Sequence, residues 1–166
     1  MPDVTTDTGL VFRRQGSAGV KIDAHALRCM EAFRQVSSFQ PEAGGILLGR
    51  LIVDSEDVVV DEVSCPMTGD RRARLSFFRH QEGHQRLIAQ RWQESEGSCH
   101  YLGEWHTHPQ ACPTPSSVDL ADWRRRLVED RFAADFLLFI IVGTYRIRMW
   151  EGIRRTLVFQ PLEMAR

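Results

Sequence analysis

Two histidines separated by one residue give the sequence its clearest chemical signal. His106 and His108 lie in residues 101–119, which read YLGEWHTHPQACPTPSSVD. We expect a β-strand over residues 101–108, and residues two apart in a strand point to the same side. The two imidazoles would therefore lie side by side, as a divalent metal ion requires. A pair of packed or hydrogen-bonded histidines at a strand end fits this spacing equally well.

Asp119 favours the metal site. It follows Ser116, which opens an expected helix over residues 116–130. Ser-x-x-Asp is close to a capping box, so Asp119 could serve only as a cap. The apolar side of this helix is formed by residues at helical spacing, namely Leu120, Trp123 and Leu127. Asp119 lies next to this apolar face of the helix, where an unpaired carboxylate would be costly to desolvate. A shared metal ion would remove this cost.

Two imidazoles and one carboxylate leave the fourth position of a tetrahedral site open for water, which is typical of catalytic zinc. Such an ion can lower the pKa of its water towards about 7 and polarise a carbonyl group. Cys112 is a competing ligand four residues after His108, but it lies in the middle of a proline-rich loop. The sequence therefore predicts a catalytic zinc site on His106, His108 and Asp119.

The composition indicates an ordinary globular protein. The chain has 166 residues, of which 43% are hydrophobic and 26% charged, so we expect a single domain over residues 1–166. Its 21 basic and 22 acidic residues leave a net charge of -1. This balance argues against a protein whose main partner is a nucleic acid or an anionic membrane.

Three features predict a cytoplasmic protein. Residues 1–15 lack an apolar segment behind a positively charged start, so we expect no secretion signal. The longest apolar run, Phe136–Val142, is far shorter than the roughly 20 residues of a membrane-spanning helix and is expected to be a strand buried on both faces. The four cysteines form no Cys-x-x-Cys pair and are expected to be reduced thiols.

Hydrophobic periodicity predicts helices interspersed among strands, which implies a layered α/β domain. We expect a helix that begins after Asp23, continues through Val36 and ends before Pro41, and a second helix over residues 81–94. Strands are expected over residues 10–13, 46–53 and 58–63, and two or three more over residues 136–159 with a turn at 143–144. Residues 65–74, CPMTGDRRAR, are expected to be a loop.

The pattern His-x-His, seven residues, Ser, two residues, Asp resembles the JAMM motif of the JAB/MPN metalloproteases. Gly103 and Pro109 flank it as they usually do in that family. The resemblance extends upstream to residues 41–49, PEAGGILLG, where the family carries its catalytic glutamate before a glycine-rich strand. It covers most of the domain, and the combined motif is highly specific.

The resemblance implies a three-layer α/β fold of the cytidine-deaminase-like type, with a mixed central sheet flanked by helices. It also implies Zn²⁺ on the three predicted ligands, Glu42 as general base and Ser116 as the donor that stabilises the oxyanion. From strand geometry alone, Glu104 would be the first candidate for the base, because it shares a face with both histidines. The family has a variable residue there, so we predict Glu42 and keep Glu104 as a residue that could support the metal site.

Members of this family typically cleave the amide after the C-terminal tail of ubiquitin or a ubiquitin-like modifier. The chain looks most like compact bacterial deubiquitinase-like members from mobile elements and CBASS anti-phage operons, where the conjugated protein is a nucleotidyltransferase. Arg71, Arg72 and Arg74 are candidate contacts to the modifier, although a solvated basic loop is the simpler interpretation. Two alternatives are a peptidase that processes sulfur-carrier precursors and a non-catalytic MPN-type scaffold.

Overall fold

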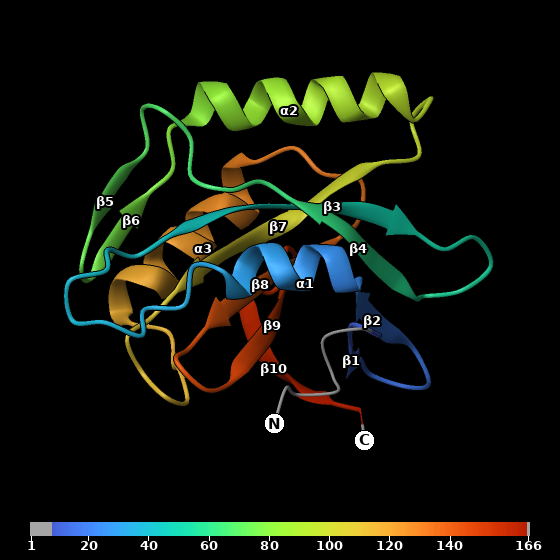
Figure 1. Ribbon diagram of the computed structural model, residues 1–166. Helices are drawn as coiled ribbons and strands as arrows, with labels where there is room; N and C mark the ends of the chain where they lie inside the picture. The colour runs from blue at the N-terminus through green and yellow to red at the C-terminus, as the bar shows by residue number, and fades with distance from the viewer. Residues whose placement is uncertain (1–7, 166) are drawn as a thin grey trace.

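The computed structural model describes residues 8–165. The N-terminal segment in which we expect no secretion signal lies partly outside the described residues, since its first seven residues are not among them. Helices are interspersed among runs of strands along the chain (Figure 1). The helices are α1 (Ala24–Glu31), α2 (Gln81–Glu94) and α3 (Ser117–Glu129). The strands are β1 (Leu10–Arg13), β2 (Gly19–Ile22), β3 (Gly44–Leu51), β4 (Val58–Val63), β5 (Arg71–Ala73), β6 (Ser76–Phe78), β7 (His100–Thr107), β8 (Phe136–Val142), β9 (Ile147–Ile153) and β10 (Val158–Met164).

The main sheet is mixed and closes on itself in the order β1-β10-β9-β8-β7-β3-β4-β2. β7 pairs with β8 in parallel, as β2 does with β4, and the other neighbours are antiparallel. The central strands β3, β7, β8 and β9 lie between α1 on one face and α2 with α3 on the other (Figure 1). The predicted three-layer α/β arrangement with a mixed central sheet is confirmed. The closure of the sheet was not predicted.

Strand β8 shows how the two layers of core are built. All seven of its residues are buried, and they alternate between the two hydrophobic clusters. Leu138 and Ile140 join the cluster beneath α1, whereas Leu137 and Phe139 join the cluster beneath α2 and α3. The prediction of a strand buried on both faces is therefore confirmed, and this strand supports β7, which carries His106 and ends directly before His108.

Gly103 allows β7 to lie against β8. Its φ of +141° is a conformation that L side chains rarely adopt, and a Cβ there would lie 1.8 Å from the carbonyl oxygen of Leu138. The pairing of β7 with β3 also shifts register next to Gly103, between Leu47 and Leu48. The strand then continues in regular pairing with β3 from Gly103 to His106. A glycine is needed here for close approach of two backbones.

Two sequence predictions about local structure are wrong. The helix expected to continue through Val36 ends at Glu31, and Val36 is 75% exposed in the turns that follow. The helix stops because Gln35 turns inward and forms buried hydrogen bonds with distant segments. The segment expected to be a loop over residues 65–74 contains β5, which pairs with β6 in a hairpin. Its residues are all exposed, so no hydrophobic alternation marks it as a strand.

The other expected elements occur within two residues of their predicted bounds, except β10, which runs to Met164. Strands β2 and β6 were not predicted. Asp23 caps α1 as expected, since its side chain accepts a hydrogen bond from Ala24 N. In residues 8–165, no helix is both long and apolar enough to cross a bilayer.

Candidate active site

The end of β7 and the start of α3 bring three predicted ligands together. His106 Nε2 lies 3.0 Å from His108 Nε2 and 3.2 Å from Asp119 Oδ1. His108 Nε2 lies 3.1 Å from Asp119 Oδ2. Within the described residues, these three side chains form a group whose ligand atoms all lie within 4.8 Å of one another, and Cys112 does not belong to it. The competing thiolate ligand is therefore not supported.

These separations fit a tetrahedral zinc ion. Zinc binds imidazole nitrogen and carboxylate oxygen at about 2.0–2.2 Å, so adjacent ligand atoms should lie roughly 3.3 Å apart. The three contacts between ligand atoms are 3.0–3.2 Å. Both Nε2 atoms and the Asp119 carboxylate also converge on one place, as the ligands of one cation do. The donor set is that of a metal site with room for further ligands.

Aromatic packing positions α3 and hence Asp119. Trp123 is buried and stacks on Phe139 of β8, with ring centroids 4.6 Å apart. The same indole contacts Trp150 and Phe159, at 5.6 Å for each pair of ring centroids. Because Asp119 lies one turn before Trp123, this packing places its carboxylate over the end of β7. The apolar side predicted for this helix is confirmed, since Trp123 and Leu127 are both buried.

Ser116 and Asp119 form the capping box of α3. The Ser116 side chain accepts from Asp119 N, and the Asp119 side chain accepts from Ser116 N. Burial alone would raise the pKa of Asp119, but hydrogen bonds from His106 and His108 lower it overall, well below its usual range. Asp119 therefore remains ionised, and the two roles considered for it from sequence, cap and ligand, are compatible in one side chain.

Gln110 orients the ring of His108. Nδ1 of His108 lies 3.3 Å from Gln110 Oε1, which also accepts from Thr114 N. An amide oxygen is only an acceptor, so Nδ1 donates to it, and Nε2 would bind a metal ion once its own proton is lost. Burial by itself would lower the pKa of His108, but its bond to Asp119 and the charges of Asp119 and Glu42 raise it overall. The sequence offered no signal for Gln110 beyond its place in the loop.

Glu42 lies in the same cavity as the three ligands. It is only 5% exposed, and burial raises its pKa to about 7, although the charge of His108 opposes the shift. Its backbone is held by the hairpin, because Glu42 N donates to Ala73 O at 2.8 Å. The next residue but one is Gly44, where a Cβ would lie 2.6 Å from both Trp105 O and the Phe77 ring. The absence of a side chain at Gly44 therefore lets the backbones approach closely beside Glu42.

Glu104 lines the cavity as its position in the strand predicts, but it is paired with Arg79 rather than with the metal-binding group. Arg79 Nε donates to Glu104 Oε2 at 3.1 Å. Burial raises the pKa of Glu104 to about 7, although the Arg79 charge opposes the shift. Glu104 thus belongs to a neighbouring charged cluster, which also includes Asp130 and Tyr101.

The cavity has a volume of about 740 Å³ and is bordered by the β5–β6 hairpin and by the first turns of α3. Leu75 and Phe78 of the hairpin and Val118 of α3 line it and are 73%, 48% and 65% exposed. An extended, partly apolar peptide could contact both sides of this opening.

The three arginines proposed from sequence as substrate contacts lie on or beside this hairpin, but they differ in their contacts. Arg72 Nε donates to Glu42 O at 2.8 Å, and its guanidinium lies over the Phe33 ring at 5.7 Å. Arg71 is exposed and lies over the Phe78 ring at 5.2 Å. Arg74 is exposed, and its carbonyl oxygen accepts from Gln35. Arg72 therefore has a structural partner, whereas the Arg71 side chain faces solvent.

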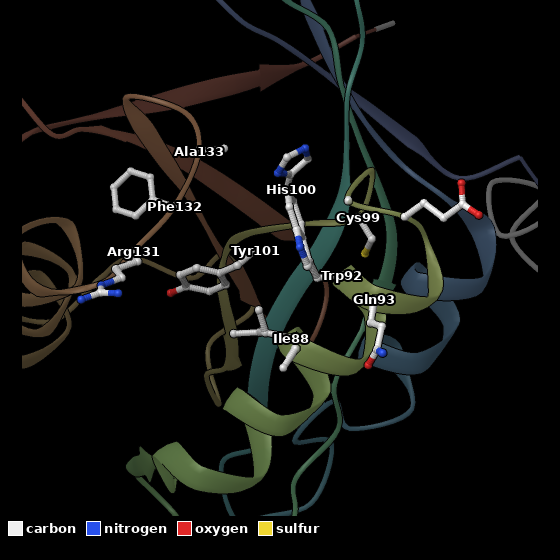
Figure 2. A pocket seen from close by; sticks show the side chains of 12 residues that line it. Ile88, Trp92, Gln93, Cys99, His100, Tyr101, Arg131, Phe132 and Ala133 are labelled. Atoms are coloured by element: carbon white, nitrogen blue, oxygen red, sulfur yellow. The ribbon is translucent and has the colours of Figure 1, made fainter.

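A second cavity of about 810 Å³ lies at the opposite end of β7 (Figure 2). It is lined by Ile88 and Trp92 of α2, by His100 and Tyr101 at the start of β7, and by Phe132 after α3. It contains none of the residues that the sequence predicts for the site. The candidate active site is therefore the cavity beside the hairpin.

Comparisons with known proteins identify a family and several relatives. The family model described as prokaryotic homologs of the JAB domain matches residues 24–153. A protein of Vibrio cholerae named CD-NTase/cGAS isopeptidase is 35% identical over 147 residues, which are 89% of each chain. Proteins with the same name from Pseudomonas aeruginosa and Escherichia coli are 36% and 32% identical and cover 81% and 86% of this chain, and 86% of their own lengths.

The fold is also found in a solved structure. The solution structure of a protein from Desulfitobacterium hafniense superposes with a TM-score of 0.57 at 22% identity, covering 87% of this chain and 90% of that one. At this identity the likeness concerns the fold alone.

Proposed function

The chain belongs to the prokaryotic JAB-domain family, and we propose that it is a zinc-dependent isopeptidase. It would hydrolyse the amide bond after the C-terminal tail of a ubiquitin-like modifier or of a protein conjugated in the same way. The observation that carries this proposal is the convergence of His106, His108 and Asp119 in one cavity with the buried carboxyl group of Glu42.

A bound zinc ion would act as a Lewis acid that polarises the scissile carbonyl and acidifies a water molecule. Glu42 takes the proton that the water loses as its oxygen attacks the carbonyl carbon. Burial raises the pKa of Glu42 to about 7, which suits a group that must first accept a proton and then release it to the departing amine. In this way the carbon–nitrogen bond breaks, and the products are a carboxylate and an amine.

Ser116 is proposed to stabilise the oxygen that becomes negatively charged in the tetrahedral intermediate. Its oxygen already accepts a hydrogen bond from Asp119 N at 3.1 Å. A serine hydroxyl that accepts through a lone pair still has its own proton to donate. Capping and oxyanion stabilisation therefore do not compete for the same atom of Ser116, which also lines the cavity.

The proposed substrate follows from the relatives. Three curated proteins at 32–36% identity over most of the chain are named CD-NTase/cGAS isopeptidase. We therefore propose that this chain removes a nucleotidyltransferase of that type from its conjugates, within a CBASS anti-phage system. The tail would lie in the opening between Leu75 and Phe78 on one side and Val118 on the other, with Arg71 and Arg74 available for acidic groups nearby.

The test is cleavage of a defined conjugate. A CD-NTase joined through its C-terminal carboxyl to a lysine side chain of a target protein is incubated with the zinc-loaded enzyme. We expect the intact mass of both products to correspond to addition of one water at that amide. A linear fusion with the same tail distinguishes isopeptidase activity from precursor processing. If neither substrate is cut by a zinc-loaded, folded preparation, the proposed function is wrong.

A further inference from the structure

A buried amide, Gln35, lies between the segments that form the site. It is only 3% exposed, in the turn that follows α1. Its Nε2 donates to Arg74 O at 2.9 Å and to Gln40 O at 3.1 Å, and its Oε1 accepts from the Thr107 hydroxyl at 2.9 Å. A buried primary amide is stable only when its donors and acceptor are paired, and here both donors are used.

Thr107 connects this amide to the residue after Glu42. It is fully buried between the two histidines in the sequence, on the opposite face of β7. Its Oγ1 accepts from Ala43 N at 2.9 Å, and its own N donates to Ala43 O at 2.8 Å. Because the hydroxyl oxygen accepts from Ala43, its proton is directed to Gln35 Oε1. The chain of hydrogen bonds therefore has a single direction, from Ala43 to Thr107 to Gln35.

The side-chain amide of Gln35 also bonds to the β5–β6 hairpin. Arg74 lies at the turn between β5 and β6, directly after Ala73, whose carbonyl oxygen accepts from Glu42 N at 2.8 Å. Arg72 also donates to Glu42 O. The backbone of Glu42 is thus held by the hairpin, and that of Ala43 by β7. Gln35 bonds to both of these supports.

We propose that Gln35 and Thr107 are positioning residues that keep Glu42 aligned with the metal-binding histidines and couple the hairpin to that alignment. The kinetic part of this inference rests on the proposed function, whereas the coupling between segments does not. Thr107 acts on Glu42 alone, through Ala43. Gln35 acts on Glu42 and on the hairpin that borders the substrate opening. The two residues should therefore differ in their effects on KM.

Hydrogen exchange on the zinc-loaded full chain tests the coupling without any substrate. Thr107→Val removes the hydroxyl at nearly constant volume, and we expect faster exchange at Ala43. Gln35→Met removes the amide at similar size, and we expect faster exchange at both Glu42 and the hairpin amides of residues 71–78. Thr107→Ser should restore protection at Ala43. Gln90→Met is the matched control, because Gln90 is exposed on α2 and bonds only to Glu94 in the described contacts.

The kinetic test uses the CD-NTase conjugate described above. Misplacing a reacting group by about 1 Å can cost about a hundredfold in rate. We therefore expect Thr107→Val to lower kcat by about tenfold to a hundredfold with KM within about twofold. Gln35→Met should lower kcat to a similar extent and also raise KM several-fold. The double variant should have the kcat of Gln35→Met, because both changes interrupt the same chain of bonds.

Two results would overturn the inference. One is unchanged exchange at Glu42 and Ala43 in both variants. The other is a parent-like kcat per zinc-loaded, folded chain despite faster exchange, which would make the network merely structural. If Thr107→Val does not fold, Thr107→Ala replaces it. If the parent cleaves no conjugate, the proposed function fails, and the exchange pattern alone decides whether Gln35 and Thr107 hold Glu42.

Discussion

Ser116 and Asp119 are joined by two reciprocal hydrogen bonds. Ser116 N donates to Asp119 Oδ2 at 2.7 Å, and Asp119 N donates to Ser116 Oγ at 3.1 Å. The same Oδ2 lies 3.1 Å from His108, and Oδ1 lies 3.2 Å from His106. The capping box at the start of α3 therefore also orients the Asp119 carboxylate towards both imidazoles. Folding of this helix end and the geometry of the proposed metal site thus depend on the same two residues.

Substitutions of Ser116 should separate capping from catalysis. Ser116→Gly removes the hydroxyl but costs only a few tenths of a kcal/mol as a cap, whereas Ser116→Ala costs about 1 kcal/mol. We expect both variants to lose about a hundredfold in kcat, as removal of one oxyanion donor does. Thermal unfolding and steady-state kinetics on the same samples provide the comparison. A glycine variant with full kcat would remove Ser116 from the mechanism.

Asp119→Asn should weaken zinc binding. The amide lacks the negative charge that attracts the ion, although it can still accept a hydrogen bond at the helix start. We expect zinc affinity, measured by competition with a chromophoric chelator, to fall at least about tenfold. Cys112→Ser is the matched control and should bind zinc like the parent, since Cys112 lies outside the metal-binding group. Equal affinity of Asp119→Asn and the parent would contradict the ligand assignment.

The buried carboxyl of Glu42 makes the stability of the metal-free protein depend on pH. Its pKa is raised by burial from 4.5 to about 7, so the folded state holds a proton that the unfolded state releases in this interval. Stability should therefore fall as pH rises from about 4.5 to about 7, by on the order of 3 kcal/mol. Glu42→Gln has no such ionisation.

Urea unfolding of the metal-free proteins at pH 5 and pH 8 measures this effect. From pH 5 to pH 8, the free energy of unfolding of the parent should fall because Glu42 ionises. The free energy of unfolding of Glu42→Gln, relative to that of the parent, should rise by the same amount. Glu104 also has a pKa raised to about 7 by burial, but it is present in both proteins and cancels in the difference. If the stabilities of the parent and the variant change with pH in parallel, the pKa of Glu42 is not raised in the folded protein.

The arginines of the hairpin should divide into two classes. Arg72→Met removes the bond to Glu42 O and should lower kcat by about tenfold with little change in KM. Arg71→Ala and Arg74→Ala, in which an exposed side chain is removed, should raise KM several-fold at constant kcat if these residues contact the modifier. Unchanged KM for both would identify them as solvated charges, the alternative considered from sequence.

Gly103→Ala should be strongly destabilising. The added Cβ would lie 1.8 Å from Leu138 O at a φ of +141°. Combined strain and overpacking of this kind cost about 3 kcal/mol or more. A thermal melt of the metal-free protein measures the loss, and Gly16→Ala is the control, because its φ is also positive but nothing lies within 4 Å of its Cβ position. Similar melting temperatures for the two variants would show that close approach is unimportant.

Most of the metal-binding group could be predicted because its signals are local. Alternation in a strand places His106 and His108 together, and helical spacing places Asp119 beside a buried side that the structure confirms at Trp123. The choice of Glu42 over Glu104 came from family resemblance. No local pattern shows that a residue about 60 positions before the histidines enters the same cavity.

What the sequence could not predict depends on long-range hydrogen bonds. Gln35 lies in a stretch with helical spacing, so its departure from the helix becomes evident only when Thr107 and Arg74 lie beside it. The β5–β6 hairpin is stabilised by backbone pairing and by Phe77 packed on Gly44, rather than by an alternating apolar pattern. Polar residues that act through distant partners leave no periodic signal.

The central claim is tested most directly by measuring zinc content and conjugate cleavage on the same preparations of the parent and Glu42→Gln, before and after exhaustive chelation and after zinc is restored. We predict one zinc per chain in both proteins and cleavage only by the zinc-loaded parent, lost on chelation and regained with the ion. Undiminished cleavage by the metal-free parent, or equal cleavage by zinc-loaded Glu42→Gln, would contradict the account.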